Sequence, residues 1–460
     1  MDYDVIIIGA GMAGLAAGVR LAHFGKKTLV CERHALVGGL NSYYRRHGIE
    51  FDVGLHAMTN YAEPKQRSAA LNRLLRQLRL DVRDLDLQPQ RFSLIRFPQE
   101  TLRFSNGIAE LEDSIARTFP GEIEGFRKLV ARIQKEDVFG WSASDLSARQ
   151  VIGEYLHDPL LTDMLLCPVM YYGNAAQGDM DFTQFCVMFI SIFLEGMARP
   201  AGGIRPLLNL LLDRFKESGG ELRMKCEVCA IRSRPGGGKE VELGDGSVLT
   251  AQSVISTAGA VETLAMFDPP PPLEAAHPEG QLAFVETILV LDRPVADLGF
   301  EASILFLNEA DTFRFQRPTS HVDGRSAVFC APGNFGGAAY QPGQETLRIT
   351  QLADYEPWMR MDTEDYLAAK AAVLESQLAL AERFAPGIRD HVVCTDIFTP
   401  RTVKRFTGHI NGAVYGSPHK IKDGRLPVEG VYLCGTDQGF LGIVGAMLSG
   451  TAIVNQYLLK

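Results

Sequence analysis

A glycine-rich turn between an apolar strand and a helix is the feature that most constrains this chain. Residues 4–8 (DVIII) are apolar and mostly β-branched after the first position, as is typical of a parallel strand buried on both faces. The run ends in residues 9–14 (GAGMAG), and a helical pattern follows over residues 15–24. This strand–turn–helix unit predicts that the chain opens with a doubly wound α/β domain.

The three glycines of the turn have separate roles in binding a dinucleotide. Gly9 makes the tight turn, Gly11 lets the backbone approach a pyrophosphate, and Gly14 lets the helix pack closely on the strand. The free N–H groups at the start of the helix then face the phosphates. The residues predicted to hold the dinucleotide here are Gly9, Gly11, Met12, Ala13 and Gly14.

An acidic residue follows at the distance expected for a ribose contact. A second apolar strand over residues 27–31 ends at Glu32. An acid about 20 residues beyond the glycine turn can accept hydrogen bonds from the ribose hydroxyls of an adenosine. The same carboxylate would repel a 2′-phosphate. Glu32 and its neighbour Arg33 are therefore predicted at the adenosine end of the site.

Two further motifs carry a resemblance to a known group of flavoproteins. Gly38, Gly39 and Leu40 form a second glycine motif, and residues 47–56 (HGIEFDVGLH) end at His56. These residues resemble the superfamily of flavin amine oxidases, phytoene desaturases, carotenoid isomerases and retinol saturases. The histidine is most similar to the retinol saturases and prolycopene-type isomerases. The resemblance implies FAD as cofactor, with the glycine pair along its phosphates and ribityl chain and the segment before His56 beside the flavin.

The C-terminal region is expected to close the same site. Residues 428–437 indicate a strand and a tight turn, and residues 442–450 indicate a helix of small apolar residues. This order is similar to the FAD-closing motif of the family, which implies that Asp437 bonds the ribityl or pyrophosphate region. The resemblance assigns to the cofactor Gly435, Asp437, Ile443 and Val444.

A central piece is expected to return to the dinucleotide domain. Residues 207–218 indicate a helix, and residues 221–232 and 248–257 indicate strands. The resemblance then places Val228 beside the adenine. A chain of 460 residues is long enough for two domains. We expect an α/β fold in which a Rossmann-like FAD-binding domain of the glutathione-reductase type (residues 1–90, 199–260 and 416–460) is interleaved with an α+β substrate-binding domain (residues 91–198 and 261–415).

Aromatic and aliphatic residues in the middle of the chain could line an apolar tunnel for the substrate. At helical spacing such a stripe is also typical of an ordinary core. Its most apolar part, residues 185–194, is shorter than the ~18 residues of a membrane span, so it indicates a buried helix or a contact with the membrane surface. The stripe consists of Tyr171, Tyr172, Phe182, Phe185, Met188, Phe189, Phe193 and Met197.

His56, Arg205 and Tyr415 are candidates for a role in catalysis, and Arg401 is a further candidate for contact with the substrate. His56 could be the polar group near the flavin, or a buried histidine with satisfied hydrogen bonds. Arg205 could neutralise the charge of reduced flavin, or cap a helix. Residues 399–416 resemble a stretch that lines the substrate entrance in carotenoid isomerases and retinol saturases, which suggests Tyr415 and Arg401 as substrate contacts.

Composition excludes some partners. The formal net charge of −9 argues against nucleic acid as the main partner. The 8 cysteines have no regular spacing and indicate reduced thiols, and the pair Cys226 and Cys229 lies on a predicted strand without a second pair, so no metal site is predicted. We expect a cytoplasmic protein with an apolar small-molecule substrate, and with peripheral membrane contact as an open alternative.

The preferred function is an FAD-dependent oxidoreductase of the phytoene desaturase and carotenoid isomerase type, which would desaturate, isomerise or saturate a polyene or isoprenoid. One alternative is a relative of amine oxidases or protoporphyrinogen oxidases with a more polar substrate. Another is a non-catalytic FAD-binding partner protein. Because no second GxGxxG motif is present, the electron acceptor or donor stays open: oxygen, a quinone, a separate reductase or a nicotinamide.

Overall fold

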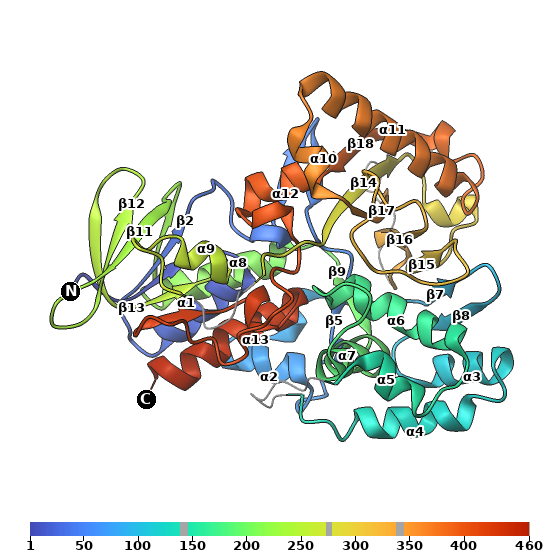
Figure 1. Cartoon of the computed structure of the whole chain (residues 1–460), viewed down its shortest axis with the longest axis horizontal. Helices are drawn as coiled ribbons and strands as arrows, with labels where there is room; N and C mark the ends of the chain where they lie inside the picture. The colour runs from blue at the N-terminus through green and yellow to red at the C-terminus, as the bar shows by residue number, and fades with distance from the viewer. Residues whose placement is uncertain (139–145, 273–277, 337–344, 460) are drawn as a thin grey trace.

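Two large β-sheets with helices packed on both form the molecule, as Figure 1 shows. The computed structural model describes residues 1–138, 146–272, 278–336 and 345–459. The first sheet lies at the end of the molecule that also carries both chain termini (Figure 1). The second sheet lies towards the opposite end, beside the long helix α11 (Thr363–Glu382).

The first sheet combines a parallel part with an antiparallel meander. Its order is β10-β2-β1-β13-β12-β11, and β19 pairs with the end of β13. β10, β2, β1, β13 and β19 pair in parallel, whereas β11, β12 and β13 pair antiparallel. β13 is long enough to pair in parallel with β1 and β19 and antiparallel with β12. The bounds are β1 (Tyr3–Ile8), β2 (Thr28–Glu32), β10 (Glu221–Met224), β11 (Val228–Ser233), β12 (Lys239–Leu243), β13 (Val248–Ser256) and β19 (Val431–Leu433).

Strand β1 is apolar from Val5 to Ile8 because its two faces are buried in two different cores. Val5 and Ile7 contribute to the core made with helices α1, α8 and α13. Ile6 and Ile8 contribute to a second core with β11, β12 and β13. Side chains alternate along a strand, so a strand covered on both faces needs a continuous apolar run. The helices of this half are α1 (Met12–His23), α2 (Ala70–Gln77), α8 (Arg205–Glu217), α9 (Ala260–Leu264) and α13 (Gly442–Ile453).

The last long helix packs directly on the first. A Cβ atom added to Gly450 of α13 would lie 2.1 Å from the carbonyl oxygen of Ala13 in α1. Only a glycine therefore allows the two backbones to approach this closely. The contact joins segments from opposite ends of the chain.

The second sheet is mostly antiparallel, in the order β18-β14-β17-β16-β15-β7-β8. In β15, Ile304 and Phe306 face the core shared with α6 and α7, whereas Leu305 and Leu307 face the core shared with α11. The bounds are β7 (Ser93–Arg96), β8 (Thr101–Phe104), β14 (Ala283–Leu291), β15 (Ile304–Asn308), β16 (Ser326–Cys330), β17 (Glu345–Ala353) and β18 (Val392–Phe398).

The remaining elements are the helices α3 to α7, which lie below the second sheet in Figure 1, the helices α10 and α12, which lie higher in that view, and two small sheets. The small sheets are the β3–β4 hairpin and the three-stranded set β5-β9-β6. The bounds are β3 (Tyr43–Arg46), β4 (Ile49–Asp52), β5 (Met58–Thr59), β6 (Leu87–Pro89), β9 (Met197–Pro200), α3 (Ala109–Thr118), α4 (Ile123–Ile133), α5 (Ala148–Gly153), α6 (Pro159–Gly173), α7 (Phe182–Phe189), α10 (Tyr355–Arg360) and α12 (Pro400–Thr407).

Several sequence predictions are confirmed, and one strand prediction is wrong. The expected α/β class and the helices after each glycine motif are present as α1 and α13. The strand predicted over residues 221–232 is instead two strands, β10 and β11, at opposite edges of the sheet. The chain turns at Lys225, whose φ is 53°, so a single strand cannot continue there. The expected domain boundaries stay a prediction.

The apolar segment 185–194 belongs to the core. Phe185, Phe189 and Phe193 are fully buried in the cluster below the second sheet. This segment is thus a buried helix, and the membrane contact considered for it is wrong. Among the described residues, no helix combines the length and apolarity needed to cross a bilayer.

Candidate cofactor and substrate site

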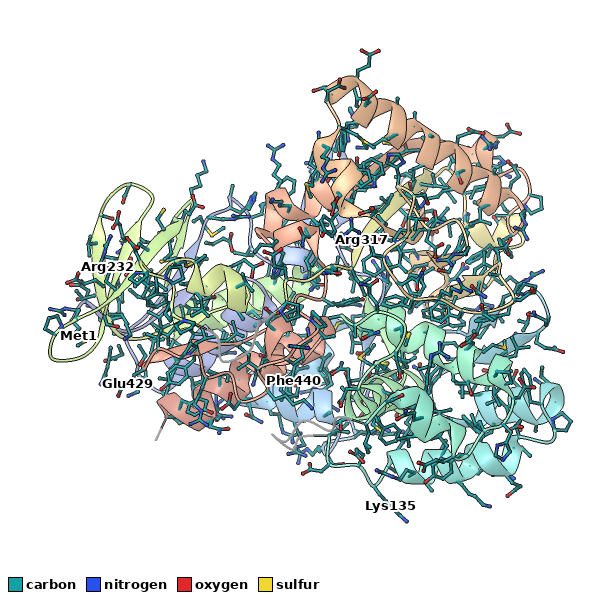
Figure 2. All side chains as sticks on the ribbon, in the orientation of Figure 1. Met1, Lys135, Arg232, Arg317, Glu429 and Phe440 are labelled. Atoms are coloured by element: carbon teal, nitrogen blue, oxygen red, sulfur yellow. The ribbon has the colours of Figure 1, made fainter. Side chains whose placement is uncertain are left out.

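A cavity of about 760 Å³ runs between the first sheet and the second. Its walls come from the glycine turn before α1, the loop after β2, the start of α13, and strands β14 and β17. Phe440, which lines the cavity, lies near the middle of the molecule in Figure 2.

The start of α1 forms one wall and is built to hold an anion. Gly11 precedes the helix and provides no side-chain cap, so the first N–H groups of α1 keep their hydrogen-bonding capacity. Gly11, Met12 and Ala13 line the cavity. A Cβ atom added to Gly11 would meet nothing within 4 Å, which leaves room for a pyrophosphate against the helix dipole.

The second glycine motif lies against the first. Gly38 adopts a φ of 107°, and its N–H donates to the carbonyl oxygen of Ala10 at 2.8 Å. A Cβ atom on Gly39 would lie 3.6 Å from the Cα atom of Gly11. Both glycines and Leu40 line the cavity. The two motifs, separated in sequence, therefore make one continuous backbone wall.

The adenosine end contains the predicted acid. The carboxylate of Glu32 accepts from the N–H of Ala10 at 2.8 Å and of His34 at 2.9 Å. A carboxylate has about four acceptor positions, so capacity for a ribose remains. Glu32, Arg33 and Val228 all line the cavity here.

The C-terminal motif contributes only part of what was predicted. Gly435 and Ile443 line the cavity, as does Gly9 at the first turn. Asp437 does not: its two carboxylate oxygens accept from the N–H groups of Ala260 and Ser417, both at 2.8 Å. The structure thus gives Asp437 the task of tying loops together behind the wall.

Some other predicted residues also lie outside the cavity lining. Gly14 packs against the turn, where an added Cβ atom would lie 2.0 Å from the carbonyl oxygen of Gly9. Val444 belongs to the core under α1. Arg205 forms an ion pair with Glu50 at the start of α8. Arg401 donates to backbone carbonyls of residues 358–361.

His56 lies at the opposite end of the cavity, in contact with the second sheet. Its Nε2 atom is 2.6 Å from an Oε2 oxygen of Glu286 on β14. Thr350 of β17, directly opposite Glu286 in the sheet register, donates to the same oxygen at 2.8 Å. His56, Glu286 and Thr350 all line the cavity. The sheet register therefore brings these groups together.

Two buried arginines hold the segment before His56. Arg348 of β17 donates to the carboxylate of Glu286 and to the carbonyl oxygens of Asp52, Val53 and Leu55. A second arginine, on β9, adds a parallel set of bonds. It is Arg199, which donates to the carbonyl oxygens of Leu55 and His56 and to the Asp52 carboxylate. Each buried cation therefore has an anion and several carbonyls as partners.

The Arg348 charge keeps Glu286 ionised. Burial alone would raise the pKa of Glu286, but the positive charges of Arg348 and His56 outweigh burial and lower the pKa to about 2. An ionised carboxylate can only accept hydrogen bonds, so the proton between the two side chains belongs to Nε2 of His56.

Sequence reasoning missed Glu286, Arg348 and Arg199, although a signal was present. Glu286 interrupts an otherwise apolar strand (AFVETILVL), and Arg348 lies inside a second largely apolar strand (ETLRITQLA). A charged residue in a strand buried on both faces needs a partner, and the nearest charged strand residue is a candidate for it. The register that pairs them is not visible in one sequence.

The wall beside His56 is largely aromatic. Tyr171, Tyr172, Phe284 and Tyr415 line it. The hydroxyl of Tyr415 donates to the carbonyl oxygen of Tyr171 at 2.5 Å, which joins residues 399–416 to α6. The other predicted tunnel residues are buried core residues that do not line the cavity: Phe182, Phe185, Met188, Phe189, Phe193 and Met197.

The fold and this cavity define a dinucleotide-binding flavoprotein. The chain belongs to the family described as flavin containing amine oxidoreductase, whose model matches residues 12–456. FAD is its cofactor, and the protein is an FAD-dependent oxidoreductase. The backbone wall of glycines and the uncapped start of α1 fit the phosphates of that cofactor.

Known proteins similar to the chain cover nearly all of it. An all-trans-retinol 13,14-reductase of Danio rerio is 24% identical, covering 99% of this chain and 87% of the relative. A chloroplastic prolycopene isomerase of Daucus carota is 22% identical, covering 98% and 79%. A crystal structure of an oxidoreductase from Methanosarcina mazei superposes with a TM-score of 0.71 at 16% identity, covering 98% of this chain and 100% of that one. The last comparison confirms the fold.

Replacing Gly11 by alanine should weaken FAD binding without unfolding the protein. Gly11 has φ −72° and ψ 179°, which any residue adopts, and its Cβ atom would point into open space. The methyl group would occupy the place of the pyrophosphate, so we expect the FAD dissociation constant to rise at least about tenfold, or ~1.4 kcal/mol. Fluorescence titration of the apoprotein with FAD measures this.

Gly14→Ala is the matched control on the same turn. Its added Cβ atom clashes with the carbonyl of Gly9, so the melting temperature of the apoprotein should fall instead. Unchanged FAD affinity in Gly11→Ala would contradict the proposed place of the phosphates.

Acid should weaken the fold through Glu286. Because its folded pKa is lowered from 4.5 to about 2, Glu286 stabilises the fold fully above about pH 4.5 and loses this contribution as the pH falls towards 2. At about 1.4 kcal/mol per pKa unit the contribution is roughly 3 kcal/mol. Urea unfolding of the wild type and Glu286→Gln should give a constant difference above pH 5 that shrinks below it. A difference that does not change down to pH 3 would contradict this.

Proposed function

We propose that this FAD-dependent oxidoreductase acts on a long apolar polyene or isoprenoid, such as a carotenoid or retinoid, by desaturation, isomerisation or saturation. The observation that carries the proposal is the wall beside His56, where aromatic and aliphatic side chains line the cavity next to the segment expected beside the flavin. The names of the two curated relatives support the same substrate class.

The side chains of this wall suit an apolar chain. Phe284, Val328 and Val414 offer hydrocarbon surface, and burial of such surface favours an apolar ligand over water. Phe284 packs edge-on against Tyr415 with ring centroids 5.9 Å apart, which gives the wall a defined shape. FAD supplies hydride transfer when bound. The chain's own residues hold the substrate, exclude water and keep His56 in place.

Two of the carboxylates that line the cavity have a buried or exposed arginine as partner, which favours a neutral substrate beside them over a cationic amine. Glu286 pairs with Arg348, and Asp396 pairs with Arg46. Glu32 and Glu227 also line the cavity, but they lie beside Val228, where the adenosine of the cofactor is expected.

An apolar substrate dissolves in lipid, so contact with a lipid surface would help the protein to reach it. The rim of the cavity has exposed side chains that could make this contact. Leu36 and Phe406 both line the cavity, although they remain 43% and 48% exposed. Arg33, Lys404 and Arg405 are exposed as well, and the guanidinium of Arg33 donates to the carbonyl oxygen of Arg405, the residue before Phe406. Exposed apolar side chains together with exposed cations suit an anionic lipid surface. We propose this rim as the site of peripheral membrane contact.

Adding the right lipid should change the spectrum of the bound flavin. All-trans-retinol, phytoene and tetra-cis-lycopene would each be added without oxygen to the FAD-loaded protein, in the oxidised and in the dithionite-reduced state. For a desaturase we expect one lipid to bleach the oxidised flavin band, and for a saturase we expect one lipid to restore it. Chromatography of the lipids identifies the product.

The wild-type apoprotein without FAD is the negative control for this conversion. Conversion of one lipid by the FAD-loaded protein and not by the apoprotein supports the proposal. If every lipid is recovered unchanged and the flavin spectrum never changes, the polyene function is wrong, and a non-catalytic FAD-binding protein becomes the better description.

Binding to vesicles tests the rim. The wild type should sediment with vesicles of phosphatidylcholine and phosphatidylglycerol, and the double variant Leu36→Ser, Phe406→Ser should lose most of this binding because its apolar contact is gone. Val248→Ser is the control, because Val248 is equally exposed (48%) but lies on the first sheet away from the cavity lining. If Val248→Ser loses as much vesicle binding as the double variant, the rim is not the membrane contact.

A further inference from the structure

The two ring nitrogens of His56 have different surroundings. Nε2 bonds to the carboxylate of Glu286, with Thr350 Oγ1 also near at 3.2 Å. Nδ1 has no hydrogen-bond partner among the described residues, and it is not fully buried. The His56 side chain lines the cavity. Of the two nitrogens, Nδ1 is therefore the one open to a ligand.

We propose that Glu286 is a positioning residue that fixes His56 with Nδ1 towards the cavity, and that Nδ1 exchanges a proton with the substrate. The proposal rests on the polyene function proposed above and narrows its reaction. Histidine is suited to the task, since its ring carries a proton at either nitrogen and exchanges it near neutral pH.

The hydrogen bonds of Glu286 and of the His56 backbone keep the His56 ring in one orientation. Arg348 donates to one carboxylate oxygen, and Thr350 and His56 contact the other, so both oxygens are occupied. Arg199 holds the backbone of His56 itself through its carbonyl oxygen at 2.8 Å. The ring is thus held from its backbone and from Nε2. A turned ring would lose the charge-assisted bond to Glu286.

The proton step balances with the chemistry of the cofactor. Saturation of a C=C bond adds a hydride to one carbon and a proton to its neighbour, and desaturation removes both. FAD, when bound, would supply or take up the hydride with its electron pair. In saturation, the imidazolium of His56 gives the proton from Nδ1 and becomes neutral while Nε2–H stays bonded to Glu286. In desaturation, neutral Nδ1 takes the proton, and the imidazolium forms beside the Glu286 carboxylate.

Turnover then needs a second redox partner. A quinone or dioxygen would accept the electron pair after desaturation, and a reduced nicotinamide or a reductase would supply it before saturation. A redox-neutral isomerisation transfers no net hydride and no net proton. The proposal narrows the reaction to desaturation or saturation, in which a net proton is exchanged at Nδ1 and the product differs from the substrate by two hydrogens.

Nitrogen-15 NMR of histidine-labelled, FAD-loaded protein tests the positioning without any turnover. His56→Gln assigns the signals. In the wild type we expect Nε2 to carry a proton at every pH at which the ring is neutral. In Glu286→Gln we expect this preference to be lost. Since that variant leaves Arg348 buried without its anion, the double variant Glu286→Gln, Arg348→Met keeps the test valid if the single variant does not fold.

Glu262→Gln is the matched control, because Glu262 is another cavity carboxylate beside a histidine, His409. It should leave the His56 signals unchanged. A neutral His56 protonated at Nδ1, or His56 signals that do not respond to loss of Glu286, would overturn the positioning role.

Conversion of the lipid identified above tests the proton exchange. We expect a product that differs by two hydrogens, a rate that falls at least about 100-fold in His56→Gln and at least about tenfold in Glu286→Gln, and a wild-type step that is slower in D2O. Partial rescue by Glu286→Asp would separate positioning from folding. A product of unchanged mass, or an undiminished rate in His56→Gln, would overturn the proton role. If no lipid reacts while the NMR result is as expected, the polyene function and the proton role fail, and the positioning role stands.

Discussion

Two buried ion pairs, Arg348 with Glu286 and Arg199 with Asp52, hold the segment before His56 between the two sheets. Both arginines also donate to the carbonyl oxygens of this segment, so its backbone stays bonded beyond the end of strand β4. Removing one partner would leave a buried charge uncompensated, which costs far more than an exposed ion pair contributes. The position of His56, and with it the chemical end of the cavity, depends on these pairs.

The parts of the site that follow from local chemistry could be predicted from the sequence. The turn at Gly9 and Gly11 has a conformation that nearby residues dictate, and Glu32 follows by chain length alone. The resemblance added the cofactor, and the family match confirms it.

The contacts in the site that depend on the register between two strands, or on groups from another loop, could not be predicted from the sequence. Glu286 and Thr350 meet only because β14 and β17 pair in one register, which one sequence does not show. Asp437 has the expected residue type in the expected motif, yet it lies behind the cavity wall, where its oxygens accept from the N–H groups of Ala260 and Ser417. The phenylalanines of α7 illustrate the same limit, since helical spacing is identical for a helix in a core and one that lines a tunnel.

The close packing of α13 on α1 has a consequence for how the protein matures in the cell. Gly450 and Ala13 lie more than 400 residues apart in sequence but in direct contact in space. Translation proceeds from the N-terminus, so the glycine turn emerges from the ribosome long before the helix that completes its surroundings. The nascent chain therefore has an incomplete cofactor site for almost the whole of its synthesis, and FAD can be enclosed only once α13 has been released.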